Sequence, residues 1–265
     1  MSRVRLDQLL VDRGLARSRS EAQSLLMAGG VQLAGSGNRA LKPGQLVAPD
    51  VELIAVSGPH WASRGGEKLA AALDVFDVDP DGLACLDAGA STGGFTDVLL
   101  ERGARVVYAV DVGRGQLVER LRTDPRVVVM DRTNLRTLEA LPEPVGLATL
   151  DLSFISLALV LPAVRRLLAP GGRVVALVKP QFEAGRDAVP SGGVVRDPAV
   201  HRAVLLQVGD AARRADFWPT KAMRSPITGS SGNVEFLAML ESDSAAGAAS
   251  DAWPQAVDAL FEASD

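Results

Sequence analysis

Residues 85–96 read Cys85-Leu-Asp-Ala-Gly-Ala-Ser-Thr-Gly-Gly-Phe-Thr96, and this stretch decides the fold. A short apolar segment ends in Asp87, small residues follow, and we expect a helix to begin near Gly93. Small residues let a backbone approach a ligand closely, and the first turn of a helix has N–H groups without helical partners. A doubly wound sheet holds nucleoside-like ligands in this way, at the carboxyl ends of its strands. The alternative is an ordinary strand, turn and helix that binds nothing.

The glycine spacing is neither Gly-x-Gly-x-x-Gly nor a phosphate loop that ends in Gly-Lys-Ser/Thr. The stretch resembles instead the first motif of S-adenosylmethionine-dependent methyltransferases. Two further acids suit such a cofactor: Asp111 ends the next apolar segment, where a carboxylate bonds ribose hydroxyls, and Asp131 ends the third, near the adenine edge. Each acid could otherwise be a capping or loop carboxylate. The expected cofactor-binding residues are Asp87, Gly89, Ser91, Thr92, Gly93, Gly94, Phe95, Asp111, Val112 and Asp131.

Apolar segments alternate with helical patterns on both sides of this motif. Continuous apolar segments such as 106–110 and 174–178 are typical of parallel strands buried on both faces. The fold class is therefore α/β, with a Rossmann-like sheet, and the resemblance of residues 85–96 implies that it is the sheet of an S-adenosylmethionine-dependent methyltransferase. Strands are expected over 84–88, 105–111, 126–131, 146–152, 173–179, 218–223 and 233–240, and helices near 94–102, 115–122, 157–168 and 198–215.

Charged side chains stand where several of these strands begin or end. Asp151 follows the fourth strand, Lys179 follows the fifth, Glu235 opens the last, and Lys68 lies on a helix before the sheet. Apolar strands rarely carry unpaired charges at their ends, and the ends of neighbouring strands meet at one edge. We therefore expect the four residues to share a pocket, with two structural salt bridges as the alternative.

Two lysines and two carboxylates in one pocket have a chemical use. A ribose 2′-hydroxyl is a weak nucleophile, so it must be held in line with a methyl donor and relieved of its proton. A lysine can accept that proton only when it is neutral, which burial or a neighbouring cation favours. We expect Lys179 to activate the hydroxyl, Asp151 and Glu235 to tune it, and Lys68 to position the ribose.

The first 55 residues have a different pattern, with two short helices followed by short strands. Leu6, Leu9 and Leu10 have helical spacing, Gly14 ends that helix, and Ser18 opens a second one. Residues 1–60 hold seven Lys/Arg and five Asp/Glu, so the basic excess lies here although the whole chain has a net charge of −4.

This segment resembles the S4 RNA-binding module, a small α+β domain. The resemblance rests on Arg5-Leu-Asp-Gln-Leu-Leu10, Gly14-Leu-Ala-Arg-Ser-Arg-Ser-Glu-Ala22, Gly30-Val-Gln-Leu33 and Leu41-Lys-Pro-Gly44. It implies that basic side chains grip RNA phosphates, for which the planar fork of arginine is well suited. A solvated helical face with scattered arginines is the alternative. The matching residues are Arg3, Arg5, Arg17, Arg19 and Lys42.

Composition narrows the remaining choices. A chain of 265 residues can form one large domain and a small one, and no apolar run is long enough to span a membrane. A lone cysteine, Cys85, excludes an internal disulfide and fits the cytoplasm, where we expect this protein. Two histidines and one cysteine make a zinc site improbable, and no metal is expected.

Taken together, the motifs of residues 3–240 are similar to the TlyA family, which comprises haemolysin-A-like rRNA 2′-O-methyltransferases. Lys68, Asp151, Lys179 and Glu235 match the family's Lys–Asp–Lys–Glu set, and Phe154 matches a position that stacks on the target nucleoside. The resemblance implies transfer of a methyl group from S-adenosylmethionine to cytidine in 16S or 23S rRNA, or both, within ribosomal subunits. The expected divisions are an RNA-binding domain (1–58), a linker (59–64), a methyltransferase domain (65–242) and a tail with a short helix (243–265).

Three other functions remain open. A base N-methyltransferase would carry an Asp/Asn-Pro-Pro-aromatic turn where this chain has Asp151-Leu-Ser-Phe154. A membrane-lytic protein, which the historical family name suggests, would need a spanning segment or a long basic amphipathic helix. A ribosome-binding factor without activity could retain the cofactor site for structure alone.

Overall fold

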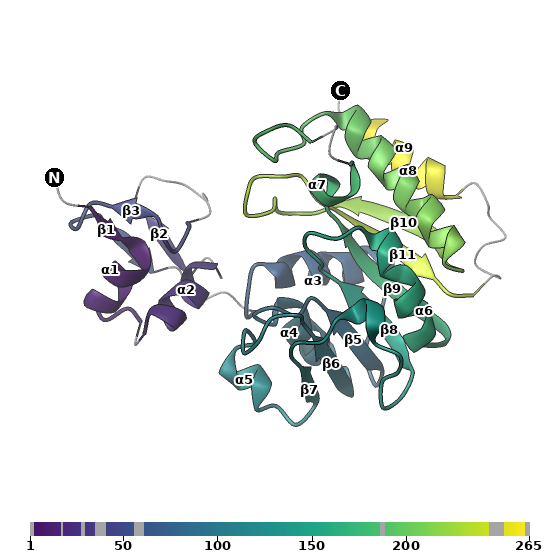
Figure 1. The fold of residues 1–265 in the computed structure, drawn as a ribbon, viewed down its shortest axis with the longest axis horizontal. Helices are drawn as coiled ribbons and strands as arrows, with labels where there is room; N and C mark the ends of the chain where they lie inside the picture. Colours follow the sequence, from purple (N-terminus) through teal and green to yellow (C-terminus); the bar gives the residue numbers. More distant parts are fainter. Residues whose placement is uncertain are drawn as a thin grey trace. The chain divides into compact units, whose positions relative to one another are not determined.

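The computed structural model describes residues 3–16, 18–27, 30–34, 41–55, 61–185, 189–243 and 252–262. The chain divides into two compact units, Met1–Gly66 and Glu67–Asp265. Each unit has its own hydrophobic core. The α/β fold class with a small α+β domain in front is therefore confirmed (Figure 1).

The first unit consists of two helices and two small antiparallel sheets. Gly14, at φ +70°, ends the first helix, and Ser18 Oγ accepts the Glu21 N–H at 3.2 Å to cap the second. Strand β1 pairs with β3, and β2 pairs with β4. The elements are β1 (Val4–Arg5), α1 (Leu6–Asp12), α2 (Arg19–Met27), β2 (Val31–Leu33), β3 (Leu46–Val47) and β4 (Leu53–Ala55). Leucines 6, 9, 10 and 26 form much of the core between them.

The second unit contains a seven-stranded sheet in the order β10-β11-β9-β8-β5-β6-β7. All neighbours are parallel except β11, which runs antiparallel to both β9 and β10. The strands are β5 (Ala84–Ala88), β6 (Val106–Val110), β7 (Val127–Met130), β8 (Val145–Leu150), β9 (Leu168–Val178), β10 (Trp218–Arg224) and β11 (Phe236–Glu241). The helices are α3 (Gly65–Phe76), α4 (Gly94–Glu101), α5 (Glu119–Arg122), α6 (Leu161–Leu167), α7 (Pro180–Glu183), α8 (Pro198–Arg214) and α9 (Ala252–Glu262).

Helices cover both faces of this sheet. α6, α8 and α9 lie on one face, and α3 and α4 lie on the other (Figure 1). Successive residues of a strand point to opposite faces. Even-numbered strand residues such as Leu86, Leu150 and Phe236 therefore share a core with α6, α8 and α9. The odd-numbered residues of β5, β8, β9 and β11 face α3 and α4.

Two expected helices differ from the structure, each for a local reason. The helix expected over 115–122 is reduced to α5, because the side chains of Asp111 and Asp131 bind the N–H groups of Gly113 and Gly115 in the preceding loop. The helix expected over 157–168 is divided into a 3₁₀ turn (Leu157–Leu159) and α6. Pro162 stands in the first turn of α6, where its missing N–H costs nothing.

The last helix is part of the second unit's core. The Trp253 side chain is 1 % exposed and donates its indole N–H to the Leu205 carbonyl at 3.0 Å. Gly209 is needed here, since a Cβ would come within 2.2 Å of the Trp253 ring. Of the expected linker, residues 59 and 60 lie outside the described part of the chain, while Ser63 Oγ caps α3 at the Gly65 N–H. The boundaries expected for the linker and the tail stay predictions.

Candidate active site

The four charged residues singled out in the sequence lie at one edge and on one face of the sheet. Asp151 and Lys179 directly follow β8 and β9, whose carboxyl ends share this edge, and Glu235 directly precedes the antiparallel β11. All three have odd numbers, as does Asp87, and so face α3 and α4. Lys68 reaches them from α3.

These residues form two close ion pairs. The Lys68 ammonium lies 2.5 Å from Glu235 Oε2, and both side chains are nearly buried, at 10 % and 4 % exposure. The Lys179 ammonium lies 2.6 Å from Asp151 Oδ1 and donates to Ser153 Oγ at 3.0 Å. The Lys179 side chain is 11 % exposed and that of Asp151 is 24 % exposed, so this pair is the more open one.

The strand register links the two pairs. Phe236 pairs with Val178 at the end of the ladder, and Glu235 and Lys179 are the next residues outward on these two strands. Facing residues of antiparallel neighbours have Cβ atoms about 5 Å apart and point to the same side. In space, the charged side chains follow one another in the order Lys68, Glu235, Lys179 and Asp151. They come from one helix and from the ends of three adjacent strands. Alternating charges over this span hold each ammonium in place.

The edge also contains the point where the strand order reverses. β8 lies beside β5 although two strands, β6 and β7, come between them in the chain, so the crevice at their carboxyl ends is where such sheets bind ligands. Asp87 stands in β5 here, fully buried, and accepts the Thr96 hydroxyl at 2.6 Å. Burial raises the pKa of the Asp87 carboxyl to about 7.

The glycines of the motif serve contacts within the chain itself. A Cβ at Gly89 (φ +85°) would come within 2.4 Å of the Asp151 carbonyl oxygen, and one at Gly93 (φ +100°) within 2.3 Å of Leu121. Gly89 thus allows the turn after β5 to lie against the residue that pairs with Lys179. We expected close approach to a ligand at these positions, whereas the described contacts are with neighbouring backbone and side chains.

The acids at the ends of β6 and β7 organise their own loops. Asp111 accepts the N–H groups of Ser91 at 2.9 Å and Gly113 at 2.6 Å, and so joins the turn after β5 to the turn after β6. Asp131 accepts the Gly115 N–H at 2.8 Å and lies 3.6 Å from Arg122. Each carboxylate retains further lone pairs for a ligand.

A cofactor with a ribose and an adenine fits this set of residues. Asp111 supplies a carboxylate for vicinal hydroxyls, and Val112 beside it is 73 % exposed, an apolar surface next to polar loops. The expected residues Ser91, Thr92 and Gly94 lie in the same turn. The Phe95 side chain is buried at 3 % exposure, so only the backbone of that residue is available to a ligand.

The structure adds Glu183, to which the sequence analysis assigns no role. Its buried carboxylate accepts the Ser156 hydroxyl at 2.6 Å and the Leu157 N–H at 2.8 Å. Burial raises the pKa of this carboxyl. Because Glu183 lies one turn beyond Lys179, it ties the loop after β8 to the segment after β9. The signal in the sequence was a carboxylate placed among apolar residues.

That loop carries Phe154, which is 89 % exposed and has φ +64°. A left-handed backbone at a bulky residue is strained and persists only where the surroundings enforce it. The ring contacts Phe182, with centroids 5.0 Å apart and planes tilted by 50°. The loop therefore presents an aromatic ring to solvent at the residue directly after Ser153, which accepts from Lys179.

Glu235 has a second neighbour that the sequence did not reveal. A Cβ at Gly229 would come within 2.4 Å of Glu235 Oε1, while Lys68 binds the other oxygen. Asn233 is 1 % exposed and bonds Gly193 and Val195, so it anchors the segment after α7 beside this edge. Only the tertiary arrangement identifies Gly229 as a position that must stay small.

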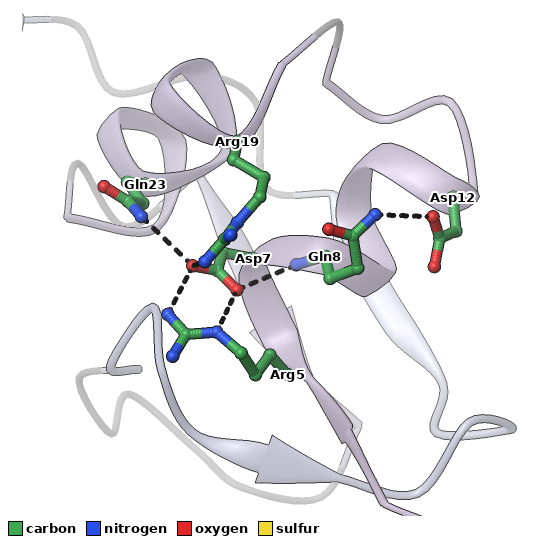
Figure 2. Close-up of polar contacts among 6 residues, drawn as sticks. All are labelled: Arg5, Asp7, Gln8, Asp12, Arg19 and Gln23. Atoms are coloured by element: carbon green, nitrogen blue, oxygen red, sulfur yellow. Dashed lines mark hydrogen bonds and ion pairs between the residues drawn. The ribbon is translucent and has the colours of Figure 1, made fainter.

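The residues expected to bind RNA lie in the first unit. Arg3 and Lys42 are exposed, and Arg17 lies outside the described residues. Arg5 and Arg19 converge on one carboxylate, that of Asp7 (Figure 2). Arg5 and Arg19 are therefore both paired with a carboxylate, which differs from the alternative interpretation of a solvated helical face with scattered arginines.

No group of three or more His, Cys, Asp or Glu residues in the described part of the chain could hold a metal ion. No helix among the described residues is both long and apolar enough to cross a bilayer.

Comparison with known proteins defines the class. Residues 61–242 match the FtsJ-like methyltransferases, and residues 4–53 match the S4 domain. S-adenosylmethionine is the methyl donor of this class. The fold and the site therefore define a methyltransferase with an S4 domain in front.

Relatives narrow the family. The 16S/23S rRNA (cytidine-2′-O)-methyltransferase TlyA of Mycobacterium tuberculosis is 48% identical over 90% of both chains. YqxC of Bacillus subtilis, described as a candidate rRNA methyltransferase, is 48% identical over 88% of this chain and 84% of its own. A solved structure from Streptococcus thermophilus, described as a candidate hemolysin, is 41% identical with a TM-score of 0.73 and covers 99% of this chain and 97% of its own. The chain belongs to the FtsJ-like methyltransferases and, among them, to the TlyA family.

Proposed function

We propose that this chain transfers the methyl group of S-adenosylmethionine to the ribose 2′-hydroxyl of cytidine in ribosomal RNA, of the 16S or 23S kind or both. The observation that carries the proposal is the pairing of Lys179 with Asp151 and of Lys68 with Glu235 beside the turn after β5. The names of the relatives supply the nucleic acid and the nucleoside. Ribosomal RNA as partner places the reaction in the cytoplasm.

Lys179 is the group that activates the hydroxyl. The cofactor supplies an electrophilic methyl group on a sulfonium centre. Lys179 Nζ first gives one proton to solvent and then, as the neutral amine, accepts the 2′-hydroxyl proton while that oxygen takes the methyl group from the sulfonium. Asp151 and Ser153 aim the nitrogen. The low exposure of both lysines also excludes water, which would compete for the donor.

Lys68 positions the ribose and Glu235 tunes the pair. An ammonium held by Glu235 on one side keeps two N–H donors for sugar hydroxyls on the other. Glu235 also faces Lys179 in the register and adds a second carboxylate field at that nitrogen. Its removal would leave Lys68 buried without a partner, at a large cost.

The cofactor is held by the turns after β5, β6 and β7. Asp111 binds the ribose hydroxyls, Val112 supports the adenine and Asp131 holds the loop that faces it. Asp87 fixes the first turn of α4 through Thr96. The remaining cofactor contacts are backbone groups of Gly89, Ser91, Thr92, Gly93, Gly94 and Phe95.

RNA is bound by the S4 domain through Arg3, Arg5, Arg17, Arg19 and Lys42, and at the site by Phe154. An exposed aromatic ring stabilises an unstacked base by roughly 1–3 kcal/mol. Arg5 and Arg19 act as phosphate ligands because guanidinium forks match phosphate oxygens.

A methyl group on the base is the competing outcome. The Asp151-Leu-Ser-Phe154 turn lacks the two prolines typical of base N-methyltransferases, and Lys179 has no use there. The test is labelled methyl transfer from S-adenosylmethionine to isolated 30S and 50S subunits, followed by digestion to nucleosides. We expect label in 2′-O-methylcytidine. Label on a base, or none on either subunit, would overturn the proposal.

A further inference from the structure

Asp7 is a fully buried carboxylate at the start of α1, and three side chains from different parts of the first unit bind it (Figure 2). Arg5 donates twice, from Nε to Oδ1 at 3.0 Å and from Nη2 to Oδ2 at 2.8 Å. Arg19 Nη2 reaches the same Oδ2 at 3.3 Å and Gln23 Nε2 reaches it at 3.1 Å. The Gln8 N–H completes the set on Oδ1.

This arrangement has more cations than its fold requires. A buried carboxylate needs a charged partner and hydrogen bonds, and Arg5, Gln8 and Gln23 already supply them. The second guanidinium gives the cluster a net charge of +1. Asp7 is hidden beneath, while the Arg5 and Arg19 side chains are 48 % and 52 % exposed. The part of the cluster that solvent can reach is therefore cationic.

The geometry points to one anion site formed by both arginines. Their Nη2 atoms contact the same oxygen of Asp7, so the oxygens of a single phosphate group can reach both guanidinium groups. Among the described residues, neither guanidinium has a polar partner other than Asp7. We propose that Asp7 is a positioning residue that holds Arg5 and Arg19 together as one receptor for a single backbone phosphate of the RNA. This inference rests on the proposed function.

Pre-organisation is what Asp7 contributes. A free arginine loses rotamer freedom when it binds a phosphate, and a side chain already held loses much less. Hydrogen bonds from Arg5 keep the pKa of the Asp7 carboxyl well below its usual range, so the anion that holds the pair is present at any neutral pH.

The decisive comparison is Asp7→Asn against Asp12→Asn, both in the full chain. Each change removes one negative charge from α1, and Asp12 is exposed and bonds only the Gln8 side chain among the described residues. Simple electrostatics predicts tighter RNA binding for both variants. If Asp7 positions the arginines, Asp7→Asn instead weakens binding to a 16S or 23S rRNA transcript roughly five- to tenfold. Asp12→Asn stays within about twofold of the unchanged chain.

A second variant covers the case in which Asp7→Asn disturbs the fold. Arg5→Lys keeps both charges but loses the paired donation, so RNA binding should again weaken while thermal unfolding and S-adenosylmethionine affinity stay unchanged. Removal of both arginines should lower the salt slope of binding by about one, because they share one phosphate; independent contacts would lower it by about two.

Inorganic phosphate separates this inference from the proposed function. Titration with phosphate, followed through the arginine Nε–H signals by NMR, should shift Arg5 and Arg19 together with one affinity. Unchanged signals, or Asp7→Asn binding RNA as tightly as Asp12→Asn, would overturn the positioning role. Failure of the unchanged chain to methylate either isolated subunit would instead refute the proposed function, whatever phosphate does.

Discussion

Both units contain ion pairs between basic side chains and carboxylates. The units differ in the number of basic side chains per carboxylate and in whether these are arginines or lysines. In the first unit, two arginines share one buried aspartate, and the arginine side chains are about half exposed. In the second, two lysines each have one carboxylate and are nearly buried. An arginine stays charged at any physiological pH, whereas a buried lysine can lose its proton. A cation excess at the surface suits anion binding, and a balanced buried pair suits proton transfer.

The buried aspartates show the same contrast. Asp7 and Asp87 are both inaccessible to solvent. Hydrogen bonds from Arg5 lower the pKa of the Asp7 carboxyl, whereas Asp87 accepts the hydroxyl and N–H of Thr96 and the Thr149 hydroxyl, and burial raises its pKa to about 7. A charged partner outweighs desolvation at Asp7, and desolvation outweighs neutral hydrogen bonds at Asp87.

The largest expected effect comes from removing Lys179 from its ion pair with Asp151. Lys179→Ala should lower the rate of methyl transfer to ribosomal subunits by about 10²–10⁴-fold, because the proton acceptor is lost. Lys179→Arg should be nearly as inactive, since a guanidinium cannot accept the proton. Lys221→Ala is the matched control, because its ammonium bonds the Phe76 carbonyl at 2.6 Å and, among the described residues, no carboxylate. Substantial turnover by Lys179→Arg would show that charge alone is needed.

Asp87→Asn tests the uncompensated carboxylate through the pH dependence of stability. The pKa of about 7 in the folded state lies above the ordinary value of 3.8, so the folded state keeps its proton between these values while the unfolded state releases it. Stability therefore falls as pH rises through this window, by roughly 4 kcal/mol from this one group. Between pH 4 and pH 8, the midpoint of thermal unfolding should fall less steeply for Asp87→Asn than for the unchanged chain. Parallel curves for the two proteins would contradict the raised pKa.

Removal of the two half-exposed arginines, Arg5 and Arg19, should weaken RNA binding without changing the methyl-transfer site. Arg5→Ala with Arg19→Ala should weaken rRNA binding roughly 10- to 50-fold at low salt, with S-adenosylmethionine affinity unchanged. Arg105→Ala with Arg202→Ala is the control, because each of these arginines has a single carboxylate partner at the surface of the second unit. Equal losses in the two double variants would show that the Asp7 cluster is nothing more than added positive charge.

The smallest expected effect concerns the loop that carries Phe154. Glu183→Gln keeps the side-chain shape but weakens its bonds to Ser156 and Leu157, so turnover should fall roughly tenfold with cofactor affinity retained. Glu139→Gln, an exposed site, is the control. Single-turnover kinetics with each subunit would separate chemistry from RNA binding. An unchanged rate would mean that the loop keeps its place without Glu183.

Much of the fold could be predicted because the local spacing of apolar residues differs between strands and helices. Apolar runs and helical spacing located the strands from Ala84 to Val178 to within a few residues. The helix expected at 115–122 was shortened because two acids that follow neighbouring strands bind the N–H groups of Gly113 and Gly115 in the loop before α5. Such side-chain competition depends on contacts between segments, and no local pattern contains it.

The sequence alone determined the order of the two units, the sheet with its ligand-binding edge, and the residue types at the strand ends, since these follow from hydrophobic period and turn chemistry. Tertiary structure decided which charges meet. Lys68 binds Glu235 across 167 positions of the chain, and Arg5 and Arg19 turn toward Asp7 instead of standing apart. Ion pairs between remote segments depend on strand register and helix packing, which place charges within a few ångströms only after the core has formed.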